Sequence, residues 1–423
     1  MNGIDLYSLM TKLFPINRSL TGQGVRETLD ILCNHVNLRR HNVLSGSKHF
    51  DWTVPKEWKV KSAYISDMSG NKIIDFQDNN LHLVGYSKSK KGDISKEELF
   101  EHLFYLEDLP TAIPYITSYY SDNWGFCISY NQYKELKDDF YYVKIDTEHF
   151  NGKMDYADYI IEGDSKEEII FSTYICHPSM ASNELSGPVV TIGLIKYLEN
   201  LPRRRYTYRF VFVPETIGSI VYINQNYNHL KNNTIAGFIV TCVGDDGDYS
   251  LVESPYGQTL ADRAVKAVLK KYNKYSKIYS FLERGSDERQ YCFPNIDLPF
   301  VAVTRTKFYE YPEYHTSLDN LNYTSPKALE NSLNYLVDIV ALMELNEFYL
   351  ASTFCEPQLG KRGLYPLIST KESNELVKNM MNVLAYCDGN NDVISIINKL
   401  FLEPNIVIDI IKTLKSNNLI KKI

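Results

Sequence analysis

The amino-acid sequence predicts an α/β protein with a mainly parallel, doubly wound sheet, a mostly β domain inserted near its start and a C-terminal winged-helix domain. Three observations lead to this prediction. Apolar strands alternate with helical patterns after residue 155, short β-like runs fill residues 42–146, and three short helical patterns followed by a strand close the chain. The length of 423 residues accommodates two or three domains.

The first domain is predicted to be discontinuous and to comprise residues 1–45 and 150–350. Its opening segment has apolar residues at helical spacing on both sides of PINRSLTG, whose Pro15 and Gly22 end one helix and allow a second. Between the two parts, residues 46–149 carry the runs AYISDM, NKIIDF, LHLVGYS, WGFCISY and FYYVKI, separated by turn residues. These runs predict an inserted β-rich domain.

The segment after residue 155 predicts the main sheet. The runs EEIIFSTYI, YTYRFVFVP, IAGFIVTCVG and LPFVAVT are apolar on both faces, and helical patterns such as SGPVVTIGLIKYLENL and ADRAVKAVLKKY separate them. This alternation is typical of a buried parallel sheet covered by helices on both sides. We therefore expect functional residues just beyond the carboxyl ends of these strands.

The last domain is predicted at residues 361–423, where three helical patterns precede the short strand LIKKI. Nine Lys and Arg residues against six Asp and Glu residues give this segment a net charge of +3, which is too small to drive phosphate binding. Its third helix begins with the apolar run NIVI, which does not suit the reading of base edges. A module that contacts a protein partner or a second copy of the chain is therefore favoured over a nucleic-acid reader.

Composition excludes further classes of function. The chain has 45 Lys and Arg residues against 52 Asp and Glu residues, so its net charge of -7 provides no basic field for nucleic acid or acidic lipid. Its seven cysteines form no CxxC pair, which favours reduced thiols and a cytoplasmic location. No run of 18 apolar residues and no signal-peptide pattern predicts association with a membrane.

Polar side chains that can bind metal or transfer protons follow the predicted strands. They are His177, Glu184, Glu215, Asp245, Asp246, His315 and Asp319. Any one of them, taken alone, is more often a structural residue. Two imidazoles and several carboxylates at one edge of a sheet nevertheless form the nitrogen and oxygen ligand set that zinc accepts without thiolates. The sequence therefore predicts a zinc site.

Zinc-dependent hydrolysis also needs a carboxylate that accepts a proton from the attacking water. Glu215 is expected in that role, with a role as metal ligand as the alternative. Cys176 and Cys242 are expected in the core, because Cys176 precedes His177 on a strand and its side chain would face the opposite way. The serines lack a GxSxG motif, so a serine hydrolase is not favoured.

The motifs HPSMASNELSG, PETIGS, TCVGDD, GSDERQYCFPNIDLPF and EYHTSLDNL, in this order, resemble those of the M28-type zinc aminopeptidase superfamily. The opening LFPINRSLTGQGVRETL is similar to that of a bacterial group of aminopeptidase-like proteins of unknown function, which have an inserted β domain and a C-terminal winged helix. The resemblance covers essentially the whole chain. It implies an M28-like doubly wound mixed sheet, a site for one or two zinc ions, and hydrolysis of an amide bond.

The ligand positions of this superfamily are only partly retained. By the resemblance, His177 and His315 match the first and last histidine ligands. The usual HxD element has become HPS, and Asn183 takes the place of the bridging aspartate, with Glu184 beside it. The paired glutamates of the superfamily are reduced to Glu215 alone. These departures favour one zinc ion over two, or chemistry that has moved away from peptide hydrolysis.

The expected site residues follow from their positions after the predicted strands and from the resemblance. The expected metal ligands are His177, Glu184, Asp245 and His315, with Glu215 as the catalytic residue and Asp246 as the alternative to Asp245. The residues expected to bind substrate or to support the ligands are Arg18, Asp246, Asp287 and Asp319, and Arg284 is a further substrate-side candidate.

The expected function is that of a cytoplasmic, zinc-dependent amide hydrolase that acts on a small-molecule or peptide substrate. One alternative is a catalytically silent relative that binds a ligand or regulatory partner. A second is a deacylase that acts on an N-acyl amino-sugar or a peptidoglycan-type fragment. A DNA-binding regulator is disfavoured by the third helix of the last domain.

Overall fold

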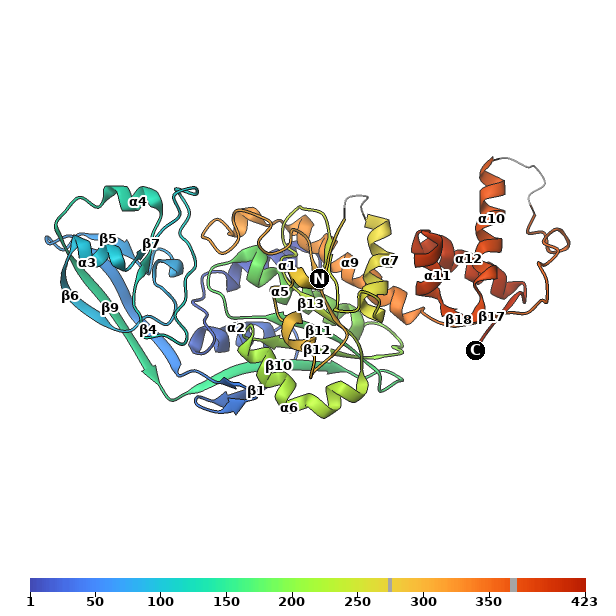
Figure 1. Ribbon diagram of the computed structural model, residues 1–423, viewed down its shortest axis with the longest axis horizontal. Helices are drawn as coiled ribbons and strands as arrows, with labels where there is room; N and C mark the ends of the chain where they lie inside the picture. The colour runs from blue at the N-terminus through green and yellow to red at the C-terminus, as the bar shows by residue number, and fades with distance from the viewer. Residues whose placement is uncertain (273–275, 366–370) are drawn as a thin grey trace.

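The computed structural model describes residues 1–272, 276–365 and 371–423, without the side chains of residues 371–374. The chain forms an elongated arrangement of three parts (Figure 1). A β-rich domain lies at one end, the α/β domain occupies the centre, and the helical C-terminal domain lies at the other end. This order in space confirms the expected fold class.

The central domain is built on one mixed sheet of eight strands. In spatial order the strands are β1 (Arg39–Leu44), β10 (Lys153–Ile161), β12 (Thr207–Val213), β11 (Glu168–Tyr174), β13 (Thr234–Val240), β16 (Phe300–Thr304), β14 (Ser250–Val252) and β15 (Lys277–Tyr279). The four strands β12, β11, β13 and β16 run parallel to one another, whereas β1 and β10 pair with their neighbours in the antiparallel sense. Strand β14 is antiparallel to β16 and parallel to β15. The carboxyl ends of the four parallel strands therefore meet at one edge of the sheet.

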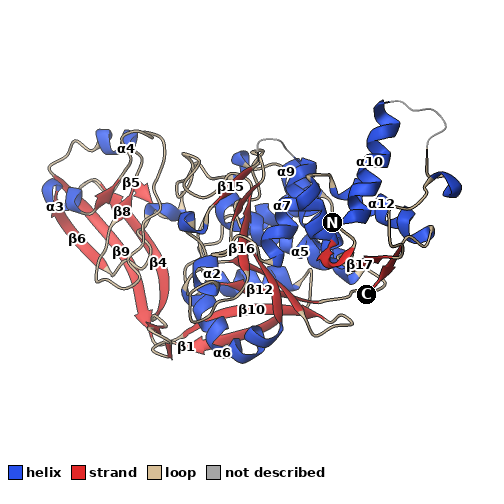
Figure 2. Cartoon of the chain, turned by 45° about the vertical axis from the view of Figure 1, so that its right-hand side comes forward, coloured by secondary structure: helices blue, strands red, loops and turns tan. Residues whose placement is uncertain are grey.

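Helices cover both faces of this sheet (Figure 2). The helices are α1 (Gly3–Leu13), α2 (Gln23–Cys33), α5 (Ser186–Glu199), α6 (Ile217–Asn233), α7 (Leu260–Tyr272), α8 (Glu288–Tyr291) and α9 (Pro326–Glu344). Successive strand residues pack into two different cores: Phe171 faces α1, α5, α7 and α9, whereas Ile170 faces α6 and α8. This period of two explains why the strands are apolar throughout.

The entry of helix α5 to the sheet depends on one glycine. A Cβ at Gly187 would lie 2.2 Å from the carbonyl oxygen of Val240 and 2.3 Å from Oγ1 of Thr173. Only glycine therefore allows the first turn of α5 to approach strands β11 and β13 this closely. The preceding Ser186 accepts a hydrogen bond from the backbone N–H of Val243 at 2.9 Å, which ties the helix start to the loop after β13.

The inserted domain contains a four-stranded antiparallel sheet, a two-stranded parallel ladder and two short helices. The elements are β4 (Glu57–Ser66), β5 (Lys72–Asp75), β6 (Lys90–Ser95), β9 (Phe140–Phe150), β7 (Leu103–Phe104), β8 (Phe126–Cys127), α3 (Lys96–Glu101) and α4 (Tyr130–Glu135). A hairpin of β2 (Lys48–His49) and β3 (Trp52–Thr53) precedes them. The run LHLVGYS, expected as a strand, instead forms a 3-10 turn at Asn80–His82 and isolated bridges, because this segment pairs with only single residues of its neighbours.

The C-terminal domain has the expected winged-helix plan with additional strands. It consists of β17 (Phe348–Ala351), α10 (Lys371–Ala385), β18 (Asp388–Asp392), α11 (Val393–Leu400), α12 (Pro404–Ser416) and β19 (Ile420–Lys422). Strand β17 pairs with both β18 and β19 and so belongs to this sheet. Its residues were expected at the end of the central domain. Residues 366–370 of the expected range 361–423 lie outside the described residues.

The winged-helix domain packs directly on the central domain. Helices α7 and α11 are in contact, and the guanidinium of Arg263 on α7 lies 2.7 Å from the carboxylate of Asp392. The side-chain oxygen of Asn346, just after α9, accepts a hydrogen bond from the backbone N–H of Ile394 at 3.0 Å. The apolar core on this side continues from the sheet helices into α10, α11 and α12.

Among the helices of the described residues, none combines the length and the apolar character that crossing a membrane requires.

Candidate functional site

The candidate site lies where strands β11 and β12 end. His177 follows the end of β11 by three residues, and Glu215 follows the end of β12 by two. His315 lies in the loop that precedes α9. The rings of His177 and His315 have their centroids 5.2 Å apart, so the structure brings together two residues that are separated by 138 positions in the chain. The three residues line the same cavity.

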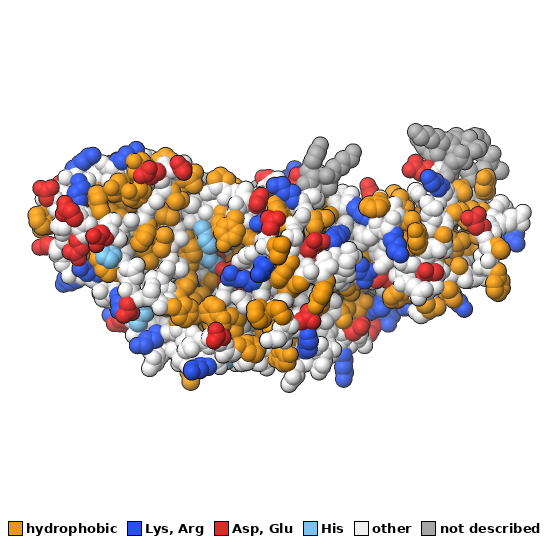
Figure 3. Space-filling model, in the orientation of Figure 1, with side chains coloured by type: hydrophobic (Ala, Val, Ile, Leu, Met, Phe, Trp, Pro, Cys, Tyr) orange, Lys and Arg blue, Asp and Glu red, His pale blue; other side chains and the backbone are white. Residues whose placement is uncertain are grey.

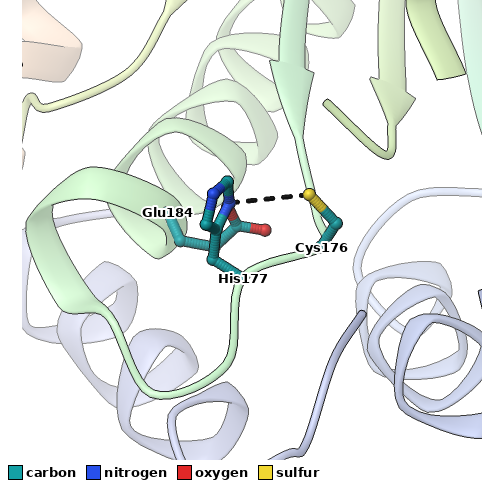
Figure 4. Close-up of side chains that lie close together, drawn as sticks. All are labelled: Cys176, His177 and Glu184. Carbon is teal, nitrogen blue, oxygen red and sulfur yellow. Dashed lines mark hydrogen bonds and ion pairs between the residues drawn. The ribbon is translucent and has the colours of Figure 1, made fainter. Parts of the chain in front are cut away.

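The two nitrogens of His177 have different partners. Nδ1 lies 2.7 Å from Oε2 of Glu184 and 3.5 Å from Sγ of Cys176 (Figure 4). Nε2 lies 3.6 Å from Oε2 of Glu215. Glu184 therefore orients the imidazole from one side, while the other ring nitrogen faces Glu215 across the cavity.

These distances indicate which side of the ring suits a metal ion. Two ligand atoms at about 2.0–2.1 Å from zinc in tetrahedral geometry lie about 3.3 Å from each other. The 3.6 Å between Nε2 of His177 and Oε2 of Glu215 is close to that separation, whereas the 2.7 Å on the Nδ1 side is a hydrogen bond. Oε1 of Glu184, on the Nδ1 side of the ring, is buried and lacks a hydrogen-bond partner among the described residues. The donor set therefore fits zinc.

His315 is less closely grouped than the sequence argument expects. Among the described residues, the three that bring potential donor atoms within 4.8 Å of one another are Cys176, His177 and Glu184. Burial and the nearby His177 lower the pKa of His315 to about 3. Its imidazole is therefore neutral at neutral pH, which is the form that a metal ion requires.

Glu215 has the protonation behaviour of a group that exchanges protons near neutral pH. Burial, with a contribution from the carboxylate of Asp287, raises the pKa of Glu215 to about 7, while the charges of His177 and Arg289 oppose the rise. A cation bound at Nε2 of His177 would lower this pKa again by direct attraction.

Asp287 and Asp319 accept hydrogen bonds from backbone N–H groups next to the site residues. Asp287 accepts a hydrogen bond from the backbone N–H of Thr216 at 2.7 Å, next to Glu215. Asp319 accepts from the backbone N–H groups of Ser182 at 2.6 Å and Asn183 at 2.8 Å. Burial raises the pKa of Asp319 to about 6, although these N–H donors oppose the rise. Asp319 thus holds the π-helical turn Ala181–Leu185 that carries Glu184.

Arg18 lies beneath the site and does not line the cavity. Its Nε donates to the carbonyl of His177 at 2.9 Å, and its Nη1 donates to the carbonyl of Leu13 at 2.7 Å. Burial lowers the pKa of Arg18 to about 10, with the negative charge of Glu184 opposing the shift. This arginine therefore positions the backbone of His177 and supplies a positive charge near Glu184.

The structure does not bring Asp245 and Asp246 to the two histidines. Oδ1 of Asp245 accepts hydrogen bonds from the backbone N–H of Gly247 at 2.7 Å and from Oγ1 of Thr306 at 2.8 Å. Asp246 is exposed and lies 3.5 Å from the hydroxyl of Ser325. Both aspartates organise the loop after β13, because that loop turns toward α9 and away from His177. Arg284 is likewise exposed, with its guanidinium over the ring of Phe281.

Cys176 lies beside His177 in the cavity, although its side chain was expected to face the opposite way. Its thiol lines the cavity and accepts a hydrogen bond from the backbone N–H of Glu215 at 3.3 Å. The expectation that Cys176 and His177 face opposite ways was wrong because β11 ends at Tyr174, so strand alternation does not extend to these residues. Burial raises the pKa of Cys176 to about 11, which leaves a protonated thiol at neutral pH.

Strained backbone conformations gather at this site. Thr216, His315 and Ser179 have φ angles of 65°, 54° and 46°, in the region that residues with side chains rarely adopt. Thr216 is also β-branched, which makes its conformation more costly. Such strain is typical of functional sites, where the surrounding structure holds a side chain in a required position.

The cavity has a volume of about 430 Å³ and is shared between two domains. From the central domain it is lined by Cys176, His177, Glu215, Thr216, Arg289, Tyr309, Tyr314 and His315, among others. From the inserted domain it is lined by Trp52, Tyr115, Thr117, Tyr119 and Tyr120. In Figure 3, pale blue histidine atoms are visible among orange apolar side chains where these two domains meet. The aromatic side chains of the inserted domain form an aromatic wall of the cavity. Neither this wall nor Arg289 could be predicted as part of the site from the sequence, because only the fold brings these residues close to the histidines.

Comparisons with known proteins place this geometry in context. Residues 7–346 match the family described as "Domain of unknown function (DUF4910)", and residues 347–422 match a winged helix-turn-helix family. A protein of Clostridium acetobutylicum, named "Putative polysaccharide biosynthesis protein with aminopeptidase-like domain", is 42% identical over 405 residues, which are 95% of this chain and 92% of that protein.

Solved structures show the same fold. A crystal structure described as a "putative peptidase" from Clostridium acetobutylicum superimposes with a TM-score of 0.91 at 40% identity, covering 100% of this chain and 96% of that one. A zinc aminopeptidase from Bacillus subtilis superimposes with a TM-score of 0.56 at 13% identity, covering 81% of this chain and 94% of that one. The expected aminopeptidase-like fold is thereby confirmed.

Proposed function

The chain belongs to the family described as "Domain of unknown function (DUF4910)", and from this premise we propose that it is a zinc-dependent amide hydrolase of the aminopeptidase-like kind. The observation that carries the proposal is the separation of 3.6 Å between Nε2 of His177 and Oε2 of Glu215 inside one cavity. At this distance the carboxylate of Glu215 is within reach of a metal ion held at Nε2 of His177, either as the group that accepts a proton from metal-bound water or as a further ligand.

Each residue has a defined task in this proposal. His177 and His315 would hold the metal ion through their imidazole nitrogens, and Glu184 keeps the ring of His177 in position through its contact with Nδ1. Bound zinc supplies polarisation of the carbonyl and an acidified water. Glu215 accepts the proton of that water and returns it to the departing amine. Arg18 and Asp319 position the segments that carry His177 and Glu184.

A second substrate class is supported by the name of the Clostridium relative, which refers to polysaccharide biosynthesis. The same chemistry applied to an N-acyl amino-sugar would be a deacylation. The aromatic wall of Trp52, Tyr119 and Tyr120 suits the flat face of a sugar ring as well as a peptide side chain.

The test combines metal content and amide hydrolysis for Glu215→Gln, with the exposed Glu199→Gln as control. Glutamine keeps the size and hydrogen bonding of Glu215 but accepts no proton, so turnover should fall about 100- to 10,000-fold while zinc stays bound. Loss of zinc together with activity would make Glu215 a ligand instead. Full activity with full zinc content, or a native protein that binds no zinc, would overturn the proposal.

A further inference from the structure

Arg289 is a cation without a countercharge inside the cavity. Its Nη2 donates to Oγ1 of Thr216 at 2.7 Å, and its Nε is buried with no hydrogen-bond partner in the part of the chain that the structure describes. No carboxylate of the described residues lies within 4.0 Å of its guanidinium, although Glu215 and Asp287 are near enough for their charges to interact with it. Arg289 as a whole is half-buried, and its buried Nε is a donor whose missing hydrogen bond costs free energy.

The neighbouring residues hold Arg289 at a defined place beside Glu215. Oε1 of Glu288 accepts hydrogen bonds from the backbone N–H groups of Gly285 at 2.8 Å and Ser286 at 3.1 Å, which fixes the turn before helix α8. Asp287 accepts from the N–H of Thr216, the residue after Glu215. The start of α8 and the end of β12 are therefore joined, and the hydrogen bond from Nη2 to Thr216 places the guanidinium next to the segment that carries Glu215.

Two carboxylates interact electrostatically with Arg289 without forming an ion pair with it. Oδ1 of Asp287 accepts a hydrogen bond from the N–H of Thr216, and Oδ2 is buried without a hydrogen-bond partner among the described residues. Glu215 faces Nε2 of His177. Neither forms an ion pair with Arg289, whose guanidinium therefore keeps donor groups of the kind that bind a carboxylate or phosphate. Because Arg289 lines the cavity together with Glu215 and His315, an anion bound there would belong to the molecule that the site transforms.

We propose that Arg289 is the specificity-determining residue of the site and binds a carboxylate carried by the substrate. The substrate class is thus an amide with an acidic group near the bond that is cleaved, either a dipeptide with a free C-terminal carboxylate or an N-acyl amino-sugar that bears an acid. This inference rests on the proposed function, because the proposed function defines which bond of the substrate is cleaved. The recognition of the anion depends on Arg289 alone and can be measured without turnover.

The experiment compares matched compounds that differ only in or near the acidic group. In the peptide arm, alanyl-alanine is compared with alanyl-alanine amide, and in the sugar arm, N-acetylmuramic acid is compared with N-acetylglucosamine. Binding is measured by calorimetry, and hydrolysis by release of amine. Each measurement is made on the full-length zinc-loaded protein and on the variants Arg289→Gln, Arg289→Lys and Arg284→Gln. Arg284 is the matched control, because it carries the same charge on the same segment but is exposed and outside the cavity.

The native protein should bind the acidic member of at least one pair more tightly, and Arg289→Gln should reduce that preference by about 10- to 100-fold, the usual effect of a charge-assisted hydrogen bond. Arg289→Lys should retain part of the preference, since it keeps the charge but not the fork. Arg284→Gln should behave like the native protein. A preference within the dipeptide pair would show that the carboxylate is a peptide C-terminus, and a preference within the sugar pair would show that an amino-sugar carries it.

Failure of this inference is distinguishable from failure of the proposed function. Equal preference in the native protein and in a folded Arg289→Gln variant, or no binding of either acidic compound, would overturn the role of Arg289 even if amides are hydrolysed. Binding that depends on Arg289 without hydrolysis of any compound would uphold the anion site and overturn the proposed hydrolysis.

Discussion

The backbone N–H of Tyr115 donates a hydrogen bond to the carbonyl of His315 at 2.8 Å. Two further bonds join the same segments, since Ile113 and Ser317 exchange hydrogen bonds of 3.0 Å and 2.9 Å. The ring of Tyr115 lies against both imidazoles, with centroids 5.1 Å from His177 and 5.3 Å from His315. The inserted domain thus helps to hold the loop that carries a proposed metal ligand.

A first prediction follows from this contact. Tyr115→Leu keeps an apolar side chain and the backbone hydrogen bond but removes the ring between the two histidines. We expect zinc affinity to fall about 10- to 100-fold, as for other residues that orient metal ligands. Competition with a chromophoric chelator measures this change. Tyr130→Ala, at a tyrosine of the same domain outside the cavity, should leave zinc affinity unchanged. Unaltered affinity in Tyr115→Leu would exclude the supporting role.

A second prediction separates a ligand role from an orienting role for Glu184. His177→Ala and His315→Ala should each abolish zinc binding while the fold is retained, because each removes a donor atom. Glu184→Gln should weaken zinc binding only about 10- to 100-fold, because its contact is with Nδ1 of His177. Metal analysis of the purified variants gives the comparison, with His229→Ala as the control outside the site. Complete loss of zinc in Glu184→Gln would show that it is a ligand, as the sequence argument expects.

A third prediction concerns the boundary of the winged-helix domain. A chain that ends at Gly360 keeps β17 but removes its partners β18 and β19, which leaves an unpaired strand that promotes aggregation. A chain that ends at Asn346 lacks this strand and should be more soluble, and both should bind zinc. Size-exclusion chromatography and zinc content provide the measurements. If neither shortened chain folds, the packing of α11 on α7 is essential to the central domain.

A fourth prediction concerns stability at acid pH. Glu168 is buried between Arg209, whose Nε is 2.7 Å away, and His229, whose Nε2 is also 2.7 Å away. Burial alone would raise the pKa of Glu168, but the guanidinium and the imidazole outweigh it and lower the pKa. Because the pKa is lower in the folded state, the stabilisation is present above the unfolded value of about 4.3 and is lost as the pH falls toward the folded value.

Glu168→Gln should therefore lower the free energy of unfolding by about 3–5 kcal/mol at pH 7, since it leaves Arg209 without its closest countercharge. The difference between the native protein and this variant should shrink below about pH 4. Urea unfolding at several pH values measures it, and Glu167→Gln at the exposed neighbour serves as control. A difference that stays constant down to pH 3 would contradict this account.

The alternation of apolar strands and helices determined the architecture and the edge of the sheet at which the site lies. His177 and Glu215 could be predicted from sequence because each directly follows a strand, and the carboxyl ends of parallel strands must meet. The three short helices and final strand of the winged helix could be predicted for the same local reason, the spacing of apolar residues. Strands β17 and β18 were missed there, because they pair with each other across about 40 residues and the sequence of β18, DGNND, consists of turn residues.

Tertiary structure alone decided which side chains meet. Asp245 follows a strand just as Glu215 does, but its loop turns toward Thr306, and no local pattern reports the direction of a loop. Cys176 lies in the cavity because β11 ends two residues before it, so the alternation of side chains along a strand does not set its direction. Tyr115 and Arg289 line the same cavity as the histidines, although they lie 62 and 112 positions from His177 in the chain, in the inserted domain and in the segment before β16. Periodicity reports which face of an element is buried, whereas the neighbours of a side chain depend on how distant elements pack.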